Sequence, residues 1–226
     1  MEMKGMIEHS VDDGTGWFYV AAPQGKRGPG VLVLHAWWGL TDFFKSVCDR
    51  LAEAGFVAVA PDLYSGKVAT TIAEAEQMVD ELDYVPAKAK VTAGVEVLLE
   101  HPSVRGKQFG VIGFSMGAGW ALQLSRLDPA EIKAVVLFYG TQALDFARAH
   151  AAYQGHFAEA DPYESDKDVR ILEQAIQGVG CEVTFYTYPG TGHWFFEADR
   201  PDAYNPQAAQ LAWERTVEFL NRQLAP

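Results

Sequence analysis

The hydrophobic positions along the chain follow two different periods. Short continuous apolar runs, typical of strands buried on both faces, are separated by stretches in which apolar residues recur every three or four positions, as on one face of a helix. The runs expected to form strands are 30–35, 56–60, 109–113, 134–139, 153–158 and 182–188. The stretches expected to form helices are 42–54, 72–82, 87–100, 116–126, a segment opened by a capping box of Ser165 and Asp168, and 207–224.

The N-terminal region has the pattern of a β-hairpin. Two apolar runs, 6–10 and 17–22, flank the turn-forming sequence Asp-Asp-Gly-Thr-Gly at 12–16. A hairpin followed by alternating strands and helices predicts an α/β fold, with a mostly parallel central sheet of about eight strands and helices on both faces. A chain of 226 residues is long enough for one well-formed core, so we expect a single domain over 1–226.

Composition narrows the classes of function. Thirty acidic and eighteen basic residues give a net charge of −12, which disfavours nucleic acid and anionic membrane surfaces as partners. The N-terminal sequence lacks the pattern of a signal peptide, and no apolar stretch reaches the ~18 residues of a membrane span. Cys48 and Cys181 lie outside any metal-ligand pattern, so we expect buried thiols. These features predict a cytoplasmic protein, either a monomer or a small homo-oligomer.

One glycine-rich turn carries a candidate nucleophile. Residues 113–117, Gly-Phe-Ser-Met-Gly, match the pattern G-x-S-x-G and stand between a predicted strand and a predicted helix. In that context the serine occupies a sharp turn that projects its hydroxyl above the sheet, and the glycines permit close approach of neighbouring backbone. The helix that follows directs free N–H groups toward developing negative charge. We predict that Ser115 is a nucleophile; the alternative is an ordinary turn between a strand and a helix.

The general base and its acid are expected farther along the chain, in the order Ser, Asp or Glu, His. His193 stands in a turn-rich loop after the last predicted strand and is the expected base, whereas His156 lies inside a strand as an expected core residue. Asp161 follows that strand and is the expected acid, with Glu159 as the alternative. Such an acid holds the histidine in the required tautomer and stabilises its charged form.

Backbone and aromatic groups complete the expected site. The N–H groups of Met116, next after the nucleophile, and of Trp37, in the loop after the 30–35 strand, are the predicted oxyanion-hole donors. Aromatic side chains in loops at the same edge of the sheet predict an apolar pocket wall. The residues proposed for it are Trp38, Tyr64, Trp194 and Phe195. The chain has no long insertion, so no large lid is expected and small acyl groups are favoured.

Together these segments resemble the dienelactone hydrolase family of α/β-hydrolases over nearly the whole chain. The resemblance implies the α/β-hydrolase fold. Residues 35–40 resemble the family's H-E-x-W-G-L, and residues 51–64 resemble its A-x-x-G-Y-x-x-x-x-P-D-L-Y stretch. The other segments that carry the resemblance are the elbow at 111–119, the strand end at 137–140, the acid segment at 157–161 and the base segment at 192–193.

Three positions depart from the family pattern. The best-known members carry cysteine where this chain has Ser115, and glutamate where it has Ala36. A serine activated directly by His193 needs no second carboxylate to manage a thiol's charge. Members that act on dienelactone carry an arginine for its carboxylate where this chain has Glu197, and Arg200 would have to reach the site from another place. The departures favour a general serine esterase over a true dienelactone hydrolase.

The predicted activity is therefore hydrolysis of small carboxylic esters or lactones through an acyl-serine intermediate, with no metal or organic cofactor. A catalytically silent binding or regulatory protein on the same fold is the alternative from another class. A true dienelactone hydrolase (carboxymethylenebutenolidase), a peptidase or another acyl transferase are alternatives within the enzymes.

Overall fold

A computed structural model describes residues 4–12, 14–127 and 131–225. The chain forms two compact units, 1–107 and 108–226. Residues 1–3 of the N-terminal segment and Asp13 of the predicted hairpin turn lie outside the described residues.

The first unit contains four strands of the sheet, in the order β1-β2-β4-β3. The β1–β2 and β2–β4 pairs are antiparallel, and the β3–β4 pair is parallel. The N-terminal hairpin is thus confirmed, with strands longer than predicted. The elements are β1 (Lys4–Val11), β2 (Gly14–Ala21), β3 (Gly28–Leu34), α1 (Asp42–Glu53), β4 (Val57–Pro61), α2 (Ile72–Asp80) and α3 (Tyr84–Glu100).

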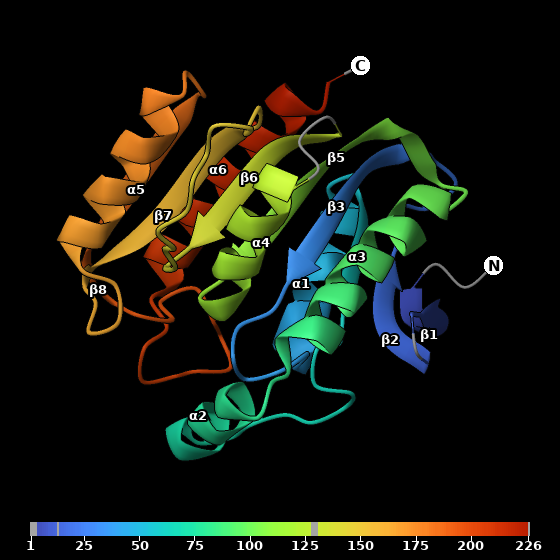
Figure 1. The fold of residues 1–226 in the computed structure, drawn as a ribbon, viewed down its shortest axis with the longest axis horizontal. Coiled ribbons are helices and arrows are strands. Elements are labelled where there is room, and N and C mark those ends of the chain that lie inside the picture. Colours follow the sequence, from blue (N-terminus) through green and yellow to red (C-terminus); the bar gives the residue numbers. More distant parts are fainter. Residues whose placement is uncertain (1–3, 13, 128–130, 226) are drawn as a thin grey trace. The chain divides into compact units, whose positions relative to one another are not determined.

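Helices α1 and α3 cover opposite faces of the strands in this first unit (Figure 1). The apolar positions that predicted α1 are buried, as the helical period requires. Helix α3 begins three residues before its predicted start, because Asp83 caps it by accepting the Val85 N–H and Pro86 stands in the first turn. A first-turn proline lacks only an N–H that would have no partner within the helix.

The second unit is built on four parallel strands in the order β5-β6-β7-β8. In Figure 1, α4 and α6 lie on opposite faces of these strands. The elements are β5 (Val104–Phe114, which starts at the end of the first unit), α4 (Met116–Leu127), β6 (Ile132–Phe138), β7 (Ala152–Ala160), α5 (Asp166–Gly178), β8 (Val183–Gly192) and α6 (Pro206–Gln223). The predicted α/β fold with mostly parallel pairing is confirmed.

The register of these strands pairs the last residues of β5 and β6, and those of β7 and β8, at their carboxyl ends. Phe114 of β5 pairs with Phe138 of β6, and Ala160 of β7 pairs with Gly192 of β8. The residues that follow these four are Ser115, Tyr139, Asp161 and His193. Parallel strands end at one edge of their sheet, so the register brings residues up to 78 positions apart in sequence to the same edge.

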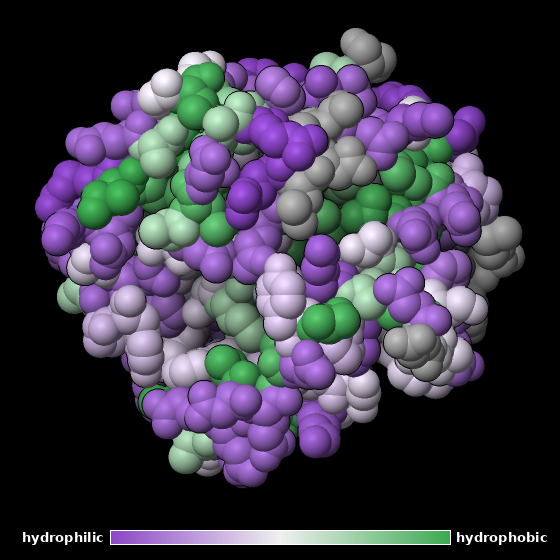
Figure 2. All heavy atoms as spheres, viewed as in Figure 1, coloured by the Kyte–Doolittle hydropathy of each residue, from purple (hydrophilic) through white to green (hydrophobic). Residues whose placement is uncertain are grey.

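Two expectations from the sequence concern membrane spans and the two thiols. Hydrophilic residues cover most of the face seen in Figure 2. Among the described residues, no helix has the length and apolar character that crossing a membrane requires. Cys48 is buried as expected, and burial raises the pKa of its thiol. Cys181 is instead partly exposed; its thiol donates to the Ala149 carbonyl at 3.3 Å.

Candidate active site

The turn at Ser115 has the geometry of a nucleophile elbow. Ser115 has φ 49°, in the left-handed region that a residue with a side chain rarely adopts. A Cβ at Gly113 would collide with the backbone of Gly117 and Ala118, so only glycine fits there. Helix α4 begins at Met116 and directs its first free N–H groups toward the turn.

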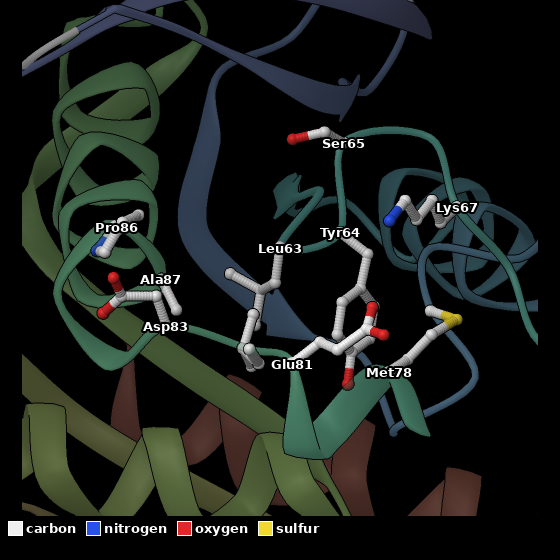
Figure 3. A pocket seen from close by; sticks show the side chains of 10 residues that line it. Leu63, Tyr64, Ser65, Lys67, Met78, Glu81, Asp83, Pro86 and Ala87 are labelled. Carbon is white, nitrogen blue, oxygen red and sulfur yellow. The ribbon is translucent and has the colours of Figure 1, made fainter. Parts of the chain in front are cut away.

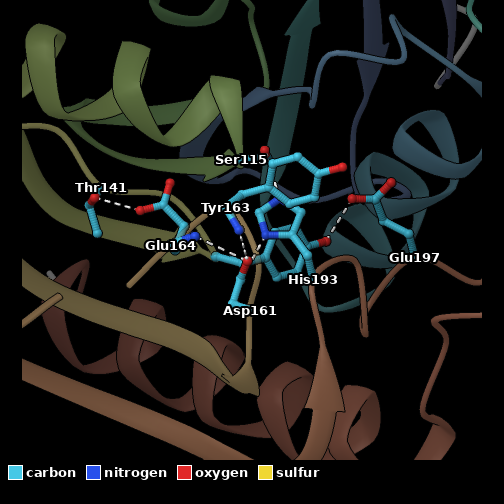
Figure 4. A network of polar contacts seen from close by, with 8 residues as sticks. Ser115, Thr141, Asp161, Tyr163, Glu164, His193 and Glu197 are labelled. Atoms are coloured by element: carbon cyan, nitrogen blue, oxygen red, sulfur yellow. Dashed lines mark hydrogen bonds and ion pairs between the residues drawn. The ribbon is translucent and has the colours of Figure 1, made fainter. Parts of the chain in front are cut away.

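His193 links this serine to a carboxylate. Its Nε2 lies 3.0 Å from the Ser115 Oγ, and its Nδ1 lies 2.7 Å from the Asp161 Oδ2 (Figure 4). A carboxylate can only accept, so Nδ1 carries the proton and Nε2 is free to accept the serine proton. The His193 and Asp161 side chains are 3% and 2% exposed, so this chain of bonds is shielded from water.

The geometry distinguishes the two candidate acids. The Asp161 Oδ1 accepts the backbone N–H groups of Tyr163 at 2.9 Å and Glu164 at 3.1 Å, which fixes the carboxylate while Oδ2 faces His193. Glu159 is exposed, and its Oε2 accepts the Gly190 N–H at 2.9 Å. The structure therefore brings Asp161 to His193, whereas Glu159 bonds the neighbouring strand end.

Aromatic rings surround the imidazole of His193. Its ring centroid lies 4.9 Å from that of Tyr139, 4.8 Å from that of Tyr163 and 5.1 Å from that of Trp194. Tyr163 is 46% exposed, so it presents a ring surface to solvent beside the candidate base. Tyr139 and Tyr163 are absent from the residues predicted for the site. Tyr139 had a signal in the sequence, since it follows an apolar strand as Ser115 does.

The two predicted oxyanion-hole donors lie in different units. Met116 follows Ser115 directly and is the first residue of α4, which is the position that the elbow requires of its N–H. Trp37 belongs to the first unit, and its part in the site stays a prediction.

The four predicted pocket residues have different environments. Trp194 is half-buried, with φ 66° and its ring 5.4 Å from that of Tyr163. Phe195 is 0% exposed, and its ring packs 5.6 Å from that of Tyr139 and 4.9 Å from that of Tyr188. Phe195 therefore belongs to the core and lies outside the proposed pocket wall.

Trp38 and Tyr64 lie in the first unit. Trp38 is buried, with its ring edge-on to Trp37 at 5.5 Å. Tyr64 lines a cavity of about 210 Å³, into which its ring points beside Met78 and Glu81 (Figure 3). Tyr64 therefore has the position of a cavity wall in its own unit.

His156 is a core residue, as predicted. It is 0% exposed in β7. Its Nδ1 lies 2.7 Å from the Tyr188 hydroxyl, and its Nε2 lies 3.1 Å from the Gln154 Oε1 and 3.0 Å from the Thr216 Oγ1. Arg215 donates to the Tyr188 oxygen at 3.2 Å, which leaves the tyrosine proton for Nδ1. Burial, with a smaller contribution from the Arg215 charge, lowers the pKa of His156 to about 3.

The buried His156 is expected to make the stability of the folded protein depend on pH. An unfolded histidine takes up a proton near pH 6.5, whereas His156 in the folded protein stays neutral down to about pH 3. Stability is therefore lost as the pH falls below 6.5, by up to about 1.4 kcal/mol per pH unit for this one proton. We expect the free energy of unfolding, measured with urea between pH 6.5 and 5.5, to depend less steeply on pH in His156→Gln than in wild type. The difference in slope should correspond to about one proton.

The control for this prediction is His150→Gln, because His150 is exposed. It should keep the wild-type slope. Burial also lowers the pKa of His35, so part of the acid sensitivity persists in the His156 variant. An identical slope in wild type and His156→Gln would contradict the prediction.

Two further carboxylates lie close to the candidate triad (Figure 4). The Glu164 Oε2 accepts the Thr141 hydroxyl at 2.5 Å, and burial raises the pKa of this carboxyl group. Glu197 is 0% exposed, and its Oε1 accepts the Tyr139 hydroxyl at 2.8 Å. Glu197, at the position where the family resemblance implies an arginine for the substrate, is thus directed into the protein.

Known proteins are similar to this chain in sequence and in fold. The model of the dienelactone hydrolase family matches residues 18–224. "Protein usf" of Aquifex pyrophilus is 35% identical over 217 residues, which cover 91% of this chain and 93% of that protein. "Putative carboxymethylenebutenolidase" of Aquifex aeolicus (strain VF5) is 32% identical over 220 residues, with coverage of 91% and 93%.

A solved structure agrees at the level of the fold. The dienelactone hydrolase-like promiscuous phosphotriesterase P91 from metagenomic libraries superposes with a TM-score of 0.89 over 98% of each chain, at 21% identity. The family match covers more than nine-tenths of this chain and includes the elbow, the acid and the base segments. The chain therefore belongs to the dienelactone hydrolase family.

Proposed function

We propose that this chain hydrolyses small carboxylic esters or lactones through an acyl intermediate on Ser115. The observation that carries the proposal is the continuous chain of bonds from the Ser115 hydroxyl through His193 to Asp161. A serine hydroxyl is a weak nucleophile until an adjacent base accepts its proton, and a base is effective when a third group orients it. Membership of a family of carboxylic ester hydrolases supports the same reaction.

The proposed reaction has two halves. In the first, the Ser115 proton passes to the His193 Nε2 while Oγ bonds to the substrate carbonyl carbon. The protonated His193 then gives this proton to the alcohol oxygen as the carbon–oxygen bond breaks, which leaves the acyl-serine. In the second half, His193 takes a proton from water, the hydroxide oxygen attacks the acyl carbon, and the Ser115 Oγ leaves with that proton.

Backbone N–H groups are proposed to stabilise the negative oxygen that forms in each half. The Met116 N–H is one donor, and the Trp37 N–H is the second. Such donors act most strongly where water is excluded, and removing one lowers the rate by roughly 10²- to 10³-fold in serine hydrolases.

The charges in the second unit favour neutral substrates. Asp161, Glu164 and Glu197 are all acidic and all lie around His193, in the network of Figure 4. A carboxylate brought to this place is repelled unless a cation faces it. We therefore propose neutral esters and lactones with small acyl groups, rather than a lactone that bears a free carboxylate. Trp194 and the exposed ring of Tyr163 supply apolar surface for such groups.

The setting of the reaction is also proposed. We propose a cytoplasmic protein that acts as a monomer or a small homo-oligomer. The acidic composition disfavours nucleic acid as a partner.

The test combines covalent labelling with a substrate panel. A fluorophosphonate should add one adduct, on Ser115, and labelling should abolish hydrolysis of p-nitrophenyl acetate. In the panel, neutral short-chain esters and lactones should be turned over with a larger kcat/KM than a matched lactone carrying a carboxylate. A protein that neither reacts with the label nor cleaves any ester would instead be a binding protein on this fold. Preference for the carboxylate-bearing lactone would indicate a true dienelactone hydrolase.

A further inference from the structure

Glu197 is a buried acidic residue that the proposed reaction does not use. It closes the turn that carries the base, since its N–H donates to the Trp194 carbonyl at 2.9 Å. Its side chain is 0% exposed and accepts the Tyr139 hydroxyl at 2.8 Å. Burying a carboxylate is unfavourable unless its charge interacts favourably with its surroundings. Glu197 lies four residues after His193 in the chain, and Tyr139 contacts both residues.

Tyr139 joins this carboxylate to the base. Its hydroxyl bonds Glu197, and its ring centroid lies 4.9 Å from that of His193, so one side chain touches both groups. The phenol is fully buried, and burial followed by the Glu197 charge raises its pKa well above the usual value. Tyr139 therefore stays a hydrogen-bond donor at any pH at which the enzyme would work.

The backbone around His193 is strained at each of these contacts. Among the described residues of the second unit, the non-glycine residues with positive φ are Ser115 at 49°, Tyr139 at 36° and Trp194 at 66°. All three contact His193 or adjoin it in sequence. Residues held in this region are unfavourable by themselves and cluster at functional sites, where the surrounding structure imposes them. Tyr139 thus shares with the nucleophile a strained backbone conformation next to the candidate base.

A close approach fixes Tyr139 beside the elbow. A Cβ placed on Gly140 would lie 2.5 Å from the Ser115 carbonyl oxygen and 2.6 Å from the Ala118 Cβ. The Tyr139 N–H donates to the His156 carbonyl at 2.8 Å, and the Ser115 N–H donates to the Phe138 carbonyl at 2.9 Å. The strand ends that carry the tyrosine and the nucleophile are therefore held together, so the backbone of Tyr139 has a fixed place beside the elbow.

We propose that Tyr139 and Glu197 form a positioning pair, which holds the His193 ring and stabilises its protonated form during proton transfer. The inference rests on the proposed function of Ser115, His193 and Asp161. The carboxylate polarises the phenol and makes its ring more electron-rich, and an electron-rich ring attracts a cation near its face. His193 is a cation only after it has taken the serine proton, so the interaction favours the transition state over the free enzyme.

The titratable groups that face His193 in the second unit come from several elements. Asp161 follows β7, Tyr163 lies in the next loop, Tyr139 follows β6, and Glu197 stands in the turn after β8. Asp199 also acts on Tyr139 through its charge. Asp161 remains in place when Glu197 is changed, so the proposed pair contributes a separable part of the electrostatic environment.

Two conservative variants test the pair. Glu197→Gln keeps the shape and the acceptor but removes the charge, and Tyr139→Phe keeps the ring but removes the hydroxyl. We expect each to lower kcat for p-nitrophenyl acetate about tenfold with KM unchanged. Without the negative charge His193 protonates less readily, so the acid limb of kcat/KM in Glu197→Gln should move to lower pH, by roughly half a pH unit. The double variant should lose no more than the worse single variant.

The control residues lie at the amino ends of β7 and β8, away from the site. Tyr153→Phe removes a buried tyrosine hydroxyl that bonds the Ser125 Oγ at 2.9 Å, and Glu182→Gln removes a charge just before β8. Both should keep the wild-type kcat and acid limb. Thermal unfolding of every variant gives the folded fraction. If Glu197→Gln does not fold, Tyr139→Phe decides the inference through kcat alone.

Distinct results separate this inference from the proposed function. Wild type that fails to hydrolyse esters and to label at Ser115 overturns both. If wild type is active, three results overturn the inference about the pair alone. The folded variants keep kcat, kcat falls while the acid limb stays in place, or the two losses add in the double variant. A fall in kcat with constant KM, the shifted limb and the non-additive double variant together support it.

Discussion

In a Ser115→Ala variant we expect kcat for p-nitrophenyl acetate to fall by about 10⁴- to 10⁶-fold, with the fold intact. The variant keeps Asp161, His193 and the N–H groups at the start of α4, so it retains only the rate that binding and oxyanion stabilisation provide. The alanine Cβ occupies the same turn at φ 49°, and the only atom lost is the hydroxyl that lies 3.0 Å from the His193 Nε2. The measurement is single-turnover and steady-state hydrolysis at saturating ester.

A second serine on the same helix gives the control. Ser125 is buried in α4, and its hydroxyl donates to the Leu122 carbonyl at 2.9 Å. Ser125→Ala should lower stability while the folded protein keeps its kcat and its fluorophosphonate adduct. If Ser115→Ala hydrolyses the ester at the wild-type rate, the nucleophile is another group and the proposed acyl-serine is wrong.

Much of the candidate site could be predicted because its residues obey a rule of chain order. The G-x-S-x-G turn sits between a strand and a helix, and the acid and base each follow a strand. The register explains why this was sufficient. Ala160 and Gly192 are paired, so the next residues, Asp161 and His193, emerge side by side. Their contact needs no more than parallel strands in the right order.

Other features could not be read from local pattern. Residues 189–192 were expected to be a loop, because Pro189 and Gly190 are turn residues, yet β8 continues to Gly192. Within the second unit β8 is the last strand in the order, and an edge position tolerates a proline that cannot donate to a partner. The register with β7 shifts between Ala158 and Ala160, which accommodates the irregularity.

The rings around the base were missed for a related reason. Tyr139 and Tyr163 contact His193 only because β6, β7 and β8 lie in that spatial order, and strand order depends on packing across the whole sheet. The mismatch of Glu197 with the family arginine was visible in the sequence, but its burial against Tyr139 was not. Glu197 meets Tyr139 because the sheet brings together the residues that follow β6 and β8, which are 58 positions apart in sequence.

We expect Asp161→Asn to lower kcat by about 10³- to 10⁴-fold while Ser115 and His193 remain in place. The asparagine Oδ1 can still accept the Tyr163 and Glu164 N–H groups, which hold Asp161 at 2.9 and 3.1 Å, so the loop keeps its shape. The asparagine NH₂, however, is a donor where the carboxylate Oδ2 accepted the Nδ1 proton at 2.7 Å. The imidazole then favours the tautomer with its proton on Nε2, and that nitrogen can no longer accept from the serine.

The alternative acid provides the decisive comparison for this prediction. Glu159→Gln removes a charge two residues away, on an exposed side chain that accepts the Gly190 N–H, and glutamine can keep that bond. It should therefore leave kcat within about twofold of wild type, since it does not touch the imidazole. The rate of fluorophosphonate labelling should fall with kcat in Asp161→Asn, because both reactions need the same activated hydroxyl. A large loss in Glu159→Gln and a near-normal Asp161→Asn would exchange the two assignments, and equal small losses in both would leave His193 without a carboxylate partner in the reaction.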